Sequence, residues 1–267
     1  MTSTNGDAAR YAEQGFLTRL PGLSATEAKG FLDQLLAIEA EQERLHRRRF
    51  ALGRQWRERG FRPHERADHP LREWLGTMAR HPAIGDAVAR VLGEDLLVRN
   101  ADIVIRPARS LFGSAWHRDT AQTGPGVDRM VTAWVALTPA TRMNGCMRFI
   151  AGSHRRPPAR RTGFSLDPRP RLRQLIDPEL REDAWIDLEH EAWNELDAGQ
   201  ISLHHMRTLH GSGTNWTGSP RVALVLRFLA DDVDPSVAGC GEAMLVRGRH
   251  RNRNIALREA VTMQWSP

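Results

Sequence analysis

Apolar residues recur at helical spacing through the first third of the chain. Ser24 and Glu27 stand three positions apart, as in a capping box at a helix start. The apolar positions that follow predict a helix over 24–47. A second helical pattern covers 71–92 and is interrupted at His81–Pro82. We expect these helices to cover one face of a sheet.

From Leu96 onward the pattern changes to short apolar and β-branched runs that are separated by Gly, Pro and Ser. Such runs are typical of β domains. With the helical first third, they predict a mainly β fold with flanking helices, namely a double-sheet jelly roll with the N-terminal helices packed on one sheet. The predicted strands are 96–105, 130–137, 147–150, 201–210 and 222–229.

The 267 residues are expected to form a single domain. Its helical N-terminal part would cover 1–95, its jelly-roll core 96–230 and its C-terminal extension 231–267. A polar segment rich in Arg and Pro, 155–195, interrupts the core, and a short helix is expected near 178–184. Irregular inserts of this length are usually functional, so we expect this one to act as a lid.

The basic excess does not indicate a nucleic-acid partner. The net charge is +6, and every basic residue except Lys29 is Arg. Arginines cluster at 47–49, 155–161 and 247–253. These clusters lack the interleaved aromatic residues of a base-stacking surface, and an anionic small substrate explains the charge as well.

No apolar run approaches the length of about eighteen residues that a membrane span needs. The first residues are polar and lack the apolar centre of a signal peptide, so we expect a cytoplasmic protein without a membrane partner. The two cysteines, Cys146 and Cys240, fit neither a metal-binding spacing nor a disulfide framework.

The candidate chemistry begins at His117-Arg118-Asp119. Of the eleven histidines, only His117 has an acidic residue two places after it. Two imidazoles and one carboxylate form the facial triad that binds non-haem Fe(II) and leaves other positions open. His210 is the favoured third ligand because it ends an apolar run and precedes Gly-Ser-Gly. The plainer alternative is a His–Asp hydrogen bond at a strand end. The other histidines considered are His154, His190, His204, His205 and His250, of which His204 and His205 are expected to be packed or hydrogen-bonded core residues.

Arg221 follows His210 by eleven residues, a spacing that allows a turn and re-entry on the neighbouring strand. Its guanidinium could bind a carboxylate in two-pronged fashion, and Ser212 could donate a hydroxyl to the same group. The alternatives are a surface Arg at a strand start and a turn-capping Ser.

Five ordered blocks surround these residues. They are W-H-R-D (116–119), T-A-W-V-A-L (132–137), N-G-C-M-R-F-I-A-G-S-H (144–154), L-D-A-G-Q-I-S-L-H-H (196–205) and L-H-G-S-G-T-N-W-T (209–217), followed by Arg221. The blocks resemble the phytanoyl-CoA dioxygenase family, and within it the bacterial small-molecule branch. The resemblance implies a double-stranded β-helix (a cupin-like jelly roll) and an oxygenase that uses Fe(II), 2-oxoglutarate and O₂.

By position, the resemblance implies that His117, Asp119 and His210 bind iron. It implies that Arg221 and Ser212 bind 2-oxoglutarate, with Trp134 beside it and Asn100 as a further hydrogen-bonding candidate; a core Trp is the alternative for Trp134. The candidates for contact with substrate are Gln122, Arg106 and Arg247.

The chain departs from the family pattern at Arg118, where relatives often carry Gln, at 120–123, where they carry an aromatic pair, and at Arg106, where they often show Lys. Strand alternation predicts that Arg118 points away from the metal, toward the surface.

The implied reaction is hydroxylation of an unactivated C–H bond in a small molecule, in bacterial specialised metabolism. Desaturation, epoxidation and cyclisation are alternative outcomes. Asp119 argues against a halogenase, because halogenating relatives replace this carboxylate by a small residue. A non-catalytic jelly-roll binding protein and a zinc hydrolase are the remaining alternatives. The substrate is expected to be anionic or tethered to a carrier protein.

Overall fold

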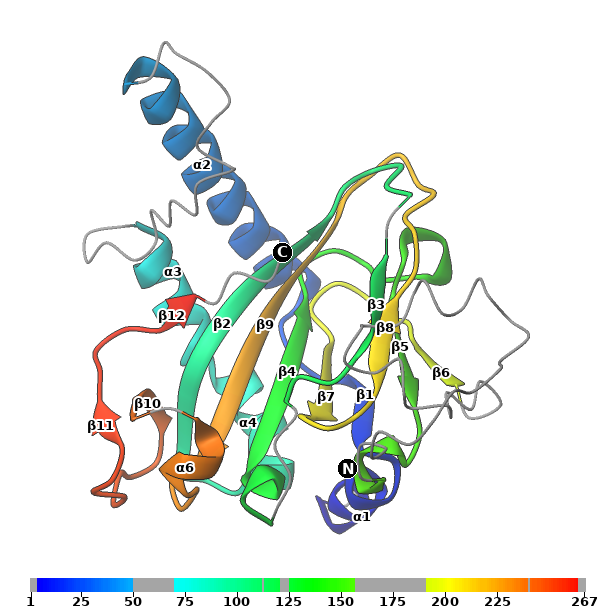
Figure 1. Ribbon diagram of the computed structural model, residues 1–267. Coiled ribbons are helices and arrows are strands. Elements are labelled where there is room, and N and C mark those ends of the chain that lie inside the picture. The colour runs from blue at the N-terminus through cyan, green and yellow to red at the C-terminus, as the bar shows by residue number, and fades with distance from the viewer. Residues whose placement is uncertain are drawn as a thin grey trace, which may run out of the picture.

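The computed structural model describes residues 4–49, 70–111, 113–120, 125–156, 191–239 and 241–263. Two β-sheets face each other (Figure 1). The larger has the order β1-β7-β4-β9-β2-β10-β11, with β12 also on β2, and the smaller has the order β3-β8-β5-β6. The strands are β1 (Phe16–Leu20), β2 (Leu96–Arg106), β3 (Ser114–His117), β4 (Met130–Ala136), β5 (Met147–Ile150), β6 (Glu191–Asn194), β7 (Ile201–His205), β8 (His210–Ser212), β9 (Arg221–Ala230), β10 (Glu242–Arg247), β11 (Ala256–Leu257) and β12 (Thr262–Met263). The predicted double-sheet jelly roll is confirmed.

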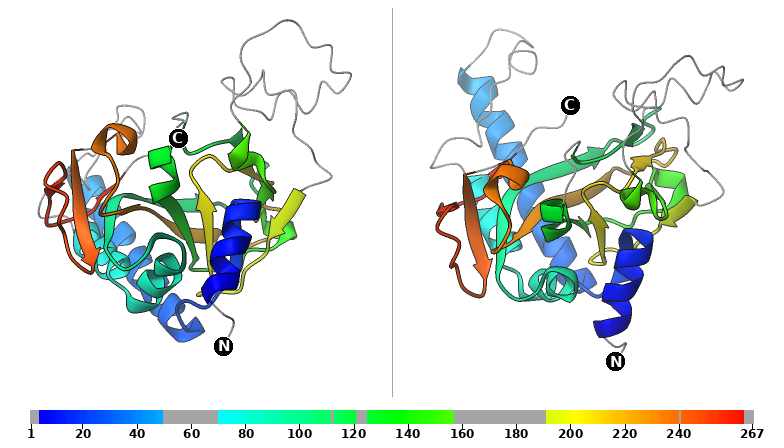
Figure 2. Two further views of the ribbon diagram at one scale, coloured as in Figure 1. Left: turned by 90° about the horizontal axis from the view of Figure 1, so that it is seen from below. Right: turned by 60° about the horizontal axis from the view of Figure 1, so that its bottom comes forward.

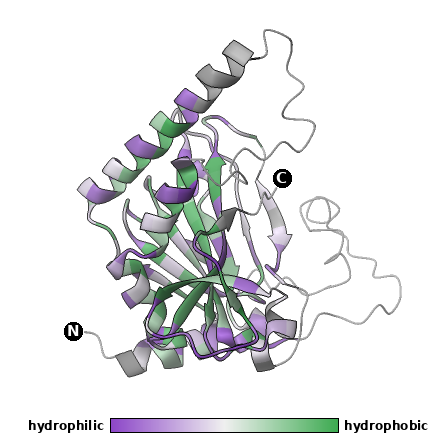
Figure 3. Ribbon diagram, turned by 90° about the vertical axis from the view of Figure 1, so that its left-hand side faces the viewer, coloured by the Kyte–Doolittle hydropathy of each residue, from purple (hydrophilic) through white to green (hydrophobic). Residues whose placement is uncertain are grey.

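Helices pack on the outer face of the larger sheet (Figures 1 and 3). They are α1 (Thr4–Gln14), α2 (Ala25–Arg49), α3 (Pro70–Ala79) and α4 (Pro82–Leu92), whereas the short α6 (Pro235–Ala238) contacts the 3-10 turn Pro125–Arg129. α4 contacts β2, β4, β7 and β9, and α1 lies at one end of the sandwich against β1 and α4 (Figure 2). None of the helices among the described residues is both long and apolar enough to span a bilayer.

The predicted helix starts and breaks match the structure. The Ser24 hydroxyl accepts from the backbone N–H of Glu27 at 3.1 Å, and the Glu27 carboxylate accepts from the N–H of Ser24 at 2.7 Å. This reciprocal cap satisfies two N–H groups that have no partner inside the helix. Pro82 begins α4 after the break at His81, where a proline cannot continue the hydrogen-bond ladder.

Strand β9 shows how the sequence separates the two faces of the larger sheet. Leu224, Leu226 and Phe228 belong to the cluster packed against the helices. The alternate residues Ala223 and Val225 face the interior between the sheets. Arg221 and Arg227 are an even number of residues from Ala223 and Val225 and therefore face the interior as well. The inner face of β9 thus has an arginine near each end.

Both flanking regions also contribute strands. β1, from the part expected to be helical, pairs with β7, and β10 and β12, from the C-terminal segment, pair with β2. The predicted helix near 178–184 lies outside the described residues, as does most of the 155–195 insert.

The single strand predicted over 201–210 is wrong. β7 ends at His205 in the larger sheet, and the chain crosses through 206–209 to begin β8 in the smaller sheet. The crossing turn is closed by the N–H of Thr208 donating to the carbonyl of His205 at 2.8 Å. Residues 206–209 contain no Gly or Pro, so the sequence gives no signal for the turn.

His205 at this crossing gives a prediction about acid stability. Burial lowers its pKa, although its hydrogen bond to Asp128 at 3.0 Å opposes the shift. The unfolded chain therefore binds a proton below about pH 6.5 before the folded protein does, and stability falls as the pH drops through that value. We expect His205→Gln, which cannot take up this proton, to lose less thermal stability than the wild type between pH 7 and pH 5. Equal losses in the two proteins would contradict this assignment.

Candidate active site

His117, Asp119 and His210 converge at the smaller sheet. His117 ends β3 and His210 begins β8, and their Cα atoms are register partners. One potential ligand atom from each of the three side chains lies within 4.8 Å of the others. The structure thus places His210 beside His117 and Asp119, which lie more than ninety positions earlier in the sequence, in the arrangement of a facial triad.

The imidazole of His210 is neutral, and its Nε2 can bind a metal. Its Nδ1 lies 2.9 Å from the carbonyl oxygen of Thr208, which requires a proton on Nδ1 and leaves Nε2 with a free lone pair. Nε2 lies 3.9 Å from Oδ1 of Asp119. Burial and the adjacent His117 hold the pKa of His210 well below its ordinary value, so the ring is uncharged at neutral pH.

Asp119 is ionised although its side chain is only 6% exposed. Burial disfavours the charge, but the Arg227 guanidinium and the hydrogen bond from His204 hold the pKa of Asp119 well below its usual range. The hydroxyl of Thr132 donates to Oδ2 at 2.6 Å, and His204 Nε2 lies 3.1 Å from the same oxygen. A buried, ionised carboxylate beside two histidines is a suitable site for a divalent cation.

Arg221 is a buried cation with no acidic partner among the described residues. It is 1% exposed, and its Nε and Nη1 have no hydrogen-bond partner among the described residues. Its guanidinium carbon lies 5.4 Å from the ring centre of Trp134. Burial, with a contribution from Arg106, lowers the pKa of Arg221 to about 10. Unpaired buried charges are costly, so the position fits an anionic group of a ligand.

Arg106 and Ser212 complete this cationic end. Arg106 is the Cα partner of Arg221 across β2 and β9. Its Nη2 donates to the hydroxyls of Ser212 and Ser114, each at 2.9 Å. Arg106, expected among the substrate contacts, therefore lies beside the residues expected to bind 2-oxoglutarate.

The remaining predicted residues lie in different places. Trp134 is 2% exposed and faces the interior, where it is both a core residue and the neighbour of Arg221. The side-chain oxygen of Asn100 accepts a hydrogen bond from Arg227 at 3.2 Å. Asn100 therefore lies beside the arginine that neighbours Asp119. Gln122 lies outside the described residues.

The structure does not bring Arg247 to this site. Its Nη1 pairs with Asp86 at 2.5 Å and its Nε with Glu94 at 2.6 Å, and its side chain is 31% exposed. These two carboxylates hold the guanidinium at the edge of the larger sheet, against α4 and the loop that follows it.

Sequence reasoning missed the residues that surround Asp119. Thr132 on β4 and Arg227 on β9 are polar residues at inward-facing positions among mostly apolar neighbours, and the alternation along these strands could have identified them. His204 was expected to be a packed or hydrogen-bonded core residue, and its contact with Asp119 confirms this. Arg118 is not a solvated surface residue, since its Nη1 donates to the carbonyls of Ser153, Arg156 and Arg207.

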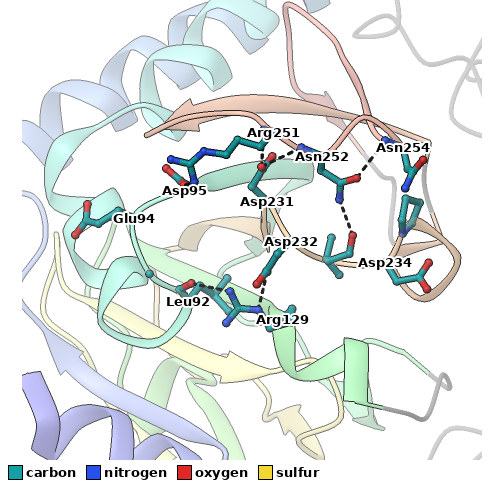
Figure 4. A pocket seen from close by; sticks show the side chains of 13 residues that line it. Leu92, Glu94, Asp95, Arg129, Asp231, Asp232, Asp234, Arg251, Asn252 and Asn254 are labelled. Atoms are coloured by element: carbon teal, nitrogen blue, oxygen red, sulfur yellow. Dashed lines mark hydrogen bonds and ion pairs between the residues drawn. The ribbon is translucent and has the colours of Figure 1, made fainter.

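A separate hollow of about 680 Å³ lies near the start of β2 and the end of β9 (Figure 4). It contains many acidic residues, but their charges are largely matched. Arg129 pairs with Asp232 at 2.8 Å and Arg251 with Asp95 at 2.9 Å, while Asp231 accepts from backbone N–H groups. Most of the acidic side chains of this hollow are therefore paired, in contrast to the buried Arg221.

A family model described as phytanoyl-CoA dioxygenase (PhyH) matches residues 11–223, which include every residue of the triad. The chain belongs to the phytanoyl-CoA dioxygenase family. The resemblance expected from the five sequence blocks is therefore confirmed, and with it the kind of fold.

Curated relatives of this PhyH chain include two dioxygenases. It is 29% identical over 183 residues to a probable alpha-ketoglutarate-dependent hypophosphite dioxygenase of Stutzerimonas stutzeri, covering 66% of this chain and 61% of the relative. It is 24% identical over 168 residues to the ectoine dioxygenase of Streptomyces coelicolor, covering 60% and 56%. The match thus spans less than two thirds of either relative.

Solved structures agree with the fold of this PhyH protein. A non-heme monooxygenase, ThoJ, in complex with nickel is 30% identical with a TM-score of 0.66, and the match covers 95% of this chain and 88% of that one. The alpha-ketoglutarate-dependent carbocyclase SnoK from nogalamycin biosynthesis has a TM-score of 0.62 at 23% identity, covering 86% and 85%, and supports the fold alone.

Proposed function

We propose that this chain is a non-haem Fe(II)/2-oxoglutarate-dependent oxygenase. The observation that carries the proposal is the pairing of a His117–Asp119–His210 triad with the buried cation of Arg221, whose Nε and Nη1 have no hydrogen-bond partner among the described residues. A metal and a carboxylate-bearing cosubstrate are the two groups that these residues fit. Bound iron and 2-oxoglutarate would together activate O₂ for oxidation of a C–H bond.

The residues of the chain would contribute positioning and charge. His117, Asp119 and His210 would bind the metal on one side, which leaves positions for the cosubstrate and O₂. Arg221, Ser212 and Arg106 form a cationic end that would bind the distal carboxylate of 2-oxoglutarate, and Trp134 would flank it. This arrangement would fix the orientation of the cosubstrate before reaction.

Hydroxylation of a small molecule in bacterial specialised metabolism is the outcome that we favour. The carboxylate of Asp119 occupies the ligand position that a halide would need, which disfavours halogenation. Desaturation, epoxidation and cyclisation stay open as alternatives, and SnoK is named as a carbocyclase.

We further infer that the substrate is anionic or tethered to a carrier, and that the enzyme acts in the cytoplasm. The Arg excess supports the first inference, and the Stutzerimonas stutzeri relative is named for hypophosphite, an anion.

The test is release of succinate from 2-oxoglutarate with a library of small-molecule substrates. We expect release to require Fe(II) and O₂ and to be abolished in His117→Ala, because that variant lacks one metal ligand. Unchanged turnover in His117→Ala would refute the metal assignment. Hydrolysis supported by zinc without succinate would identify the hydrolase alternative, and chlorinated product from the wild type would refute the hydroxylase assignment.

A further inference from the structure

The proposed metal ligands and the groups that hold Asp119 come from opposite sheets. His117 and His210 lie in β3 and β8 of the smaller sheet, and Asp119 follows β3. Thr132, His204 and Arg227 lie in β4, β7 and β9 of the larger sheet. Thr132 is the Cα partner of both His204 and Arg227, so the three form one row across that sheet. Asp119 therefore connects the two sheets.

The two oxygens of Asp119 have different surroundings. Oδ2 is bonded to the Thr132 hydroxyl at 2.6 Å and lies 3.1 Å from His204 Nε2. Oδ1 lies 3.9 Å from His210 Nε2 and 3.5 Å from the Arg227 guanidinium. Oδ1 thus faces the neighbouring ligand atom, whereas Oδ2 is turned toward the larger sheet.

The proton of His204 can be placed from its contacts. Nε2 must donate to reach the carboxylate, and Nδ1 is buried without a hydrogen-bond partner among the described residues. Phe149 lies beside the ring, with 5.3 Å between the ring centres. Both contacts at Oδ2 are therefore donated to the carboxylate, and Thr132 and His204 together occupy that oxygen.

We propose that Thr132 and His204 are positioning residues that make Asp119 a one-oxygen ligand, through Oδ1 alone. This inference rests on the proposed function, since it assumes a metal at the triad. A carboxylate that bound through both oxygens would fill one further position on the metal. Holding Oδ2 away keeps that position available to the cosubstrate or O₂.

Matched substitutions separate this role from a purely structural one. Thr132→Val removes the hydroxyl and retains the shape, whereas Thr132→Ser retains the hydroxyl. His204→Leu removes the donor, whereas His204→Gln retains an N–H at a similar reach. Thr77→Val is the control, because that hydroxyl donates to the Glu73 carbonyl on an exposed turn of α3.

The measurement is a Co(II) titration of the full chain, followed by visible absorption, which requires no turnover. We expect Thr132→Val and His204→Leu to weaken Co(II) binding about tenfold or more and to change the spectrum, because loss of groups that orient metal ligands has effects of this size. The Co(II) affinity and spectrum of Thr132→Ser and His204→Gln should be closer to those of the wild type than the values of Thr132→Val and His204→Leu are. Thr77→Val should have the affinity and spectrum of the wild type.

Wild-type affinity and spectrum in both Thr132→Val and His204→Leu would overturn the inference, while loss of Co(II) binding in His117→Ala would leave the proposed function standing. Co(II) binding that survives in His117→Ala would overturn both. Thermal unfolding of the metal-free proteins identifies any variant that does not fold. If Thr132→Val does not fold, the Co(II) affinities of His204→Leu and His204→Gln test the inference, and wild-type affinity and spectrum in His204→Leu would overturn it.

Discussion

Replacing Arg221 with Met should raise the KM for 2-oxoglutarate about a hundredfold or more. Removal of one partner of a buried, hydrogen-bonded charge pair costs about 2–5 kcal/mol, and each 1.4 kcal/mol corresponds to about a factor of ten. The same substitution should raise the unfolding temperature of the ligand-free protein. Arg221 is 1% exposed and has no acidic partner among the described residues, so an apolar side chain of similar length suits the site better when no anion is bound.

Steady-state kinetics with varied 2-oxoglutarate and thermal unfolding would measure the two effects. Arg247→Met is the matched control, because that arginine is held by Asp86 and Glu94 away from the site. It should leave the KM for 2-oxoglutarate unchanged. A normal KM in Arg221→Met would show that the cosubstrate carboxylate binds elsewhere.

Replacing Asp119 with Ala should abolish metal-dependent turnover and also destabilise the metal-free protein by about 3 kcal/mol. The reason for the second effect is that Arg227 would lose one of its two carboxylate neighbours while remaining buried, with Asp102 as the other at 2.5 Å. Because the pKa of Asp119 is held well below its usual value, the stabilisation is present above about pH 3.9 and is lost as the pH falls through the folded-state pKa.

Urea unfolding of the metal-free proteins at neutral pH would test this prediction. Adding Arg227→Met to Asp119→Ala should lower the stability further, because the buried Asp102 carboxylate then loses its guanidinium partner. Asp232→Ala, which breaks a largely exposed ion pair with Arg129, should cost less than about 1 kcal/mol. Equal losses in Asp119→Ala and Asp232→Ala would contradict the role of the buried charge.

Local signals made much of the fold predictable. The Ser24–Glu27 cap, the break before Pro82 and the alternation along β9 each depend on short-range physics that a single sequence displays. The strand predicted over 201–210 could not be divided, because its crossing turn carries no breaker and only the pairing of β7 and β8 with different sheets reveals it.

The candidate site was predictable in the residues that match a motif and unpredictable in their surroundings. Arg118 was expected at the surface because strand alternation was extended past the end of β3 at His117. The structure instead uses it to bind three carbonyls from two other segments. Such contacts join residues far apart in the sequence, and no local pattern encodes them.

The inner face of β9 constrains how this family can vary. Arg221 and Arg227 are six residues apart, an even number, so both face the interior. One inserted residue between them would turn one arginine toward the helices and leave a charge in an apolar layer. The turn before β9 is free of this parity requirement. Within β9, changes in chain length should therefore be tolerated only in pairs or where a bulge restores the register.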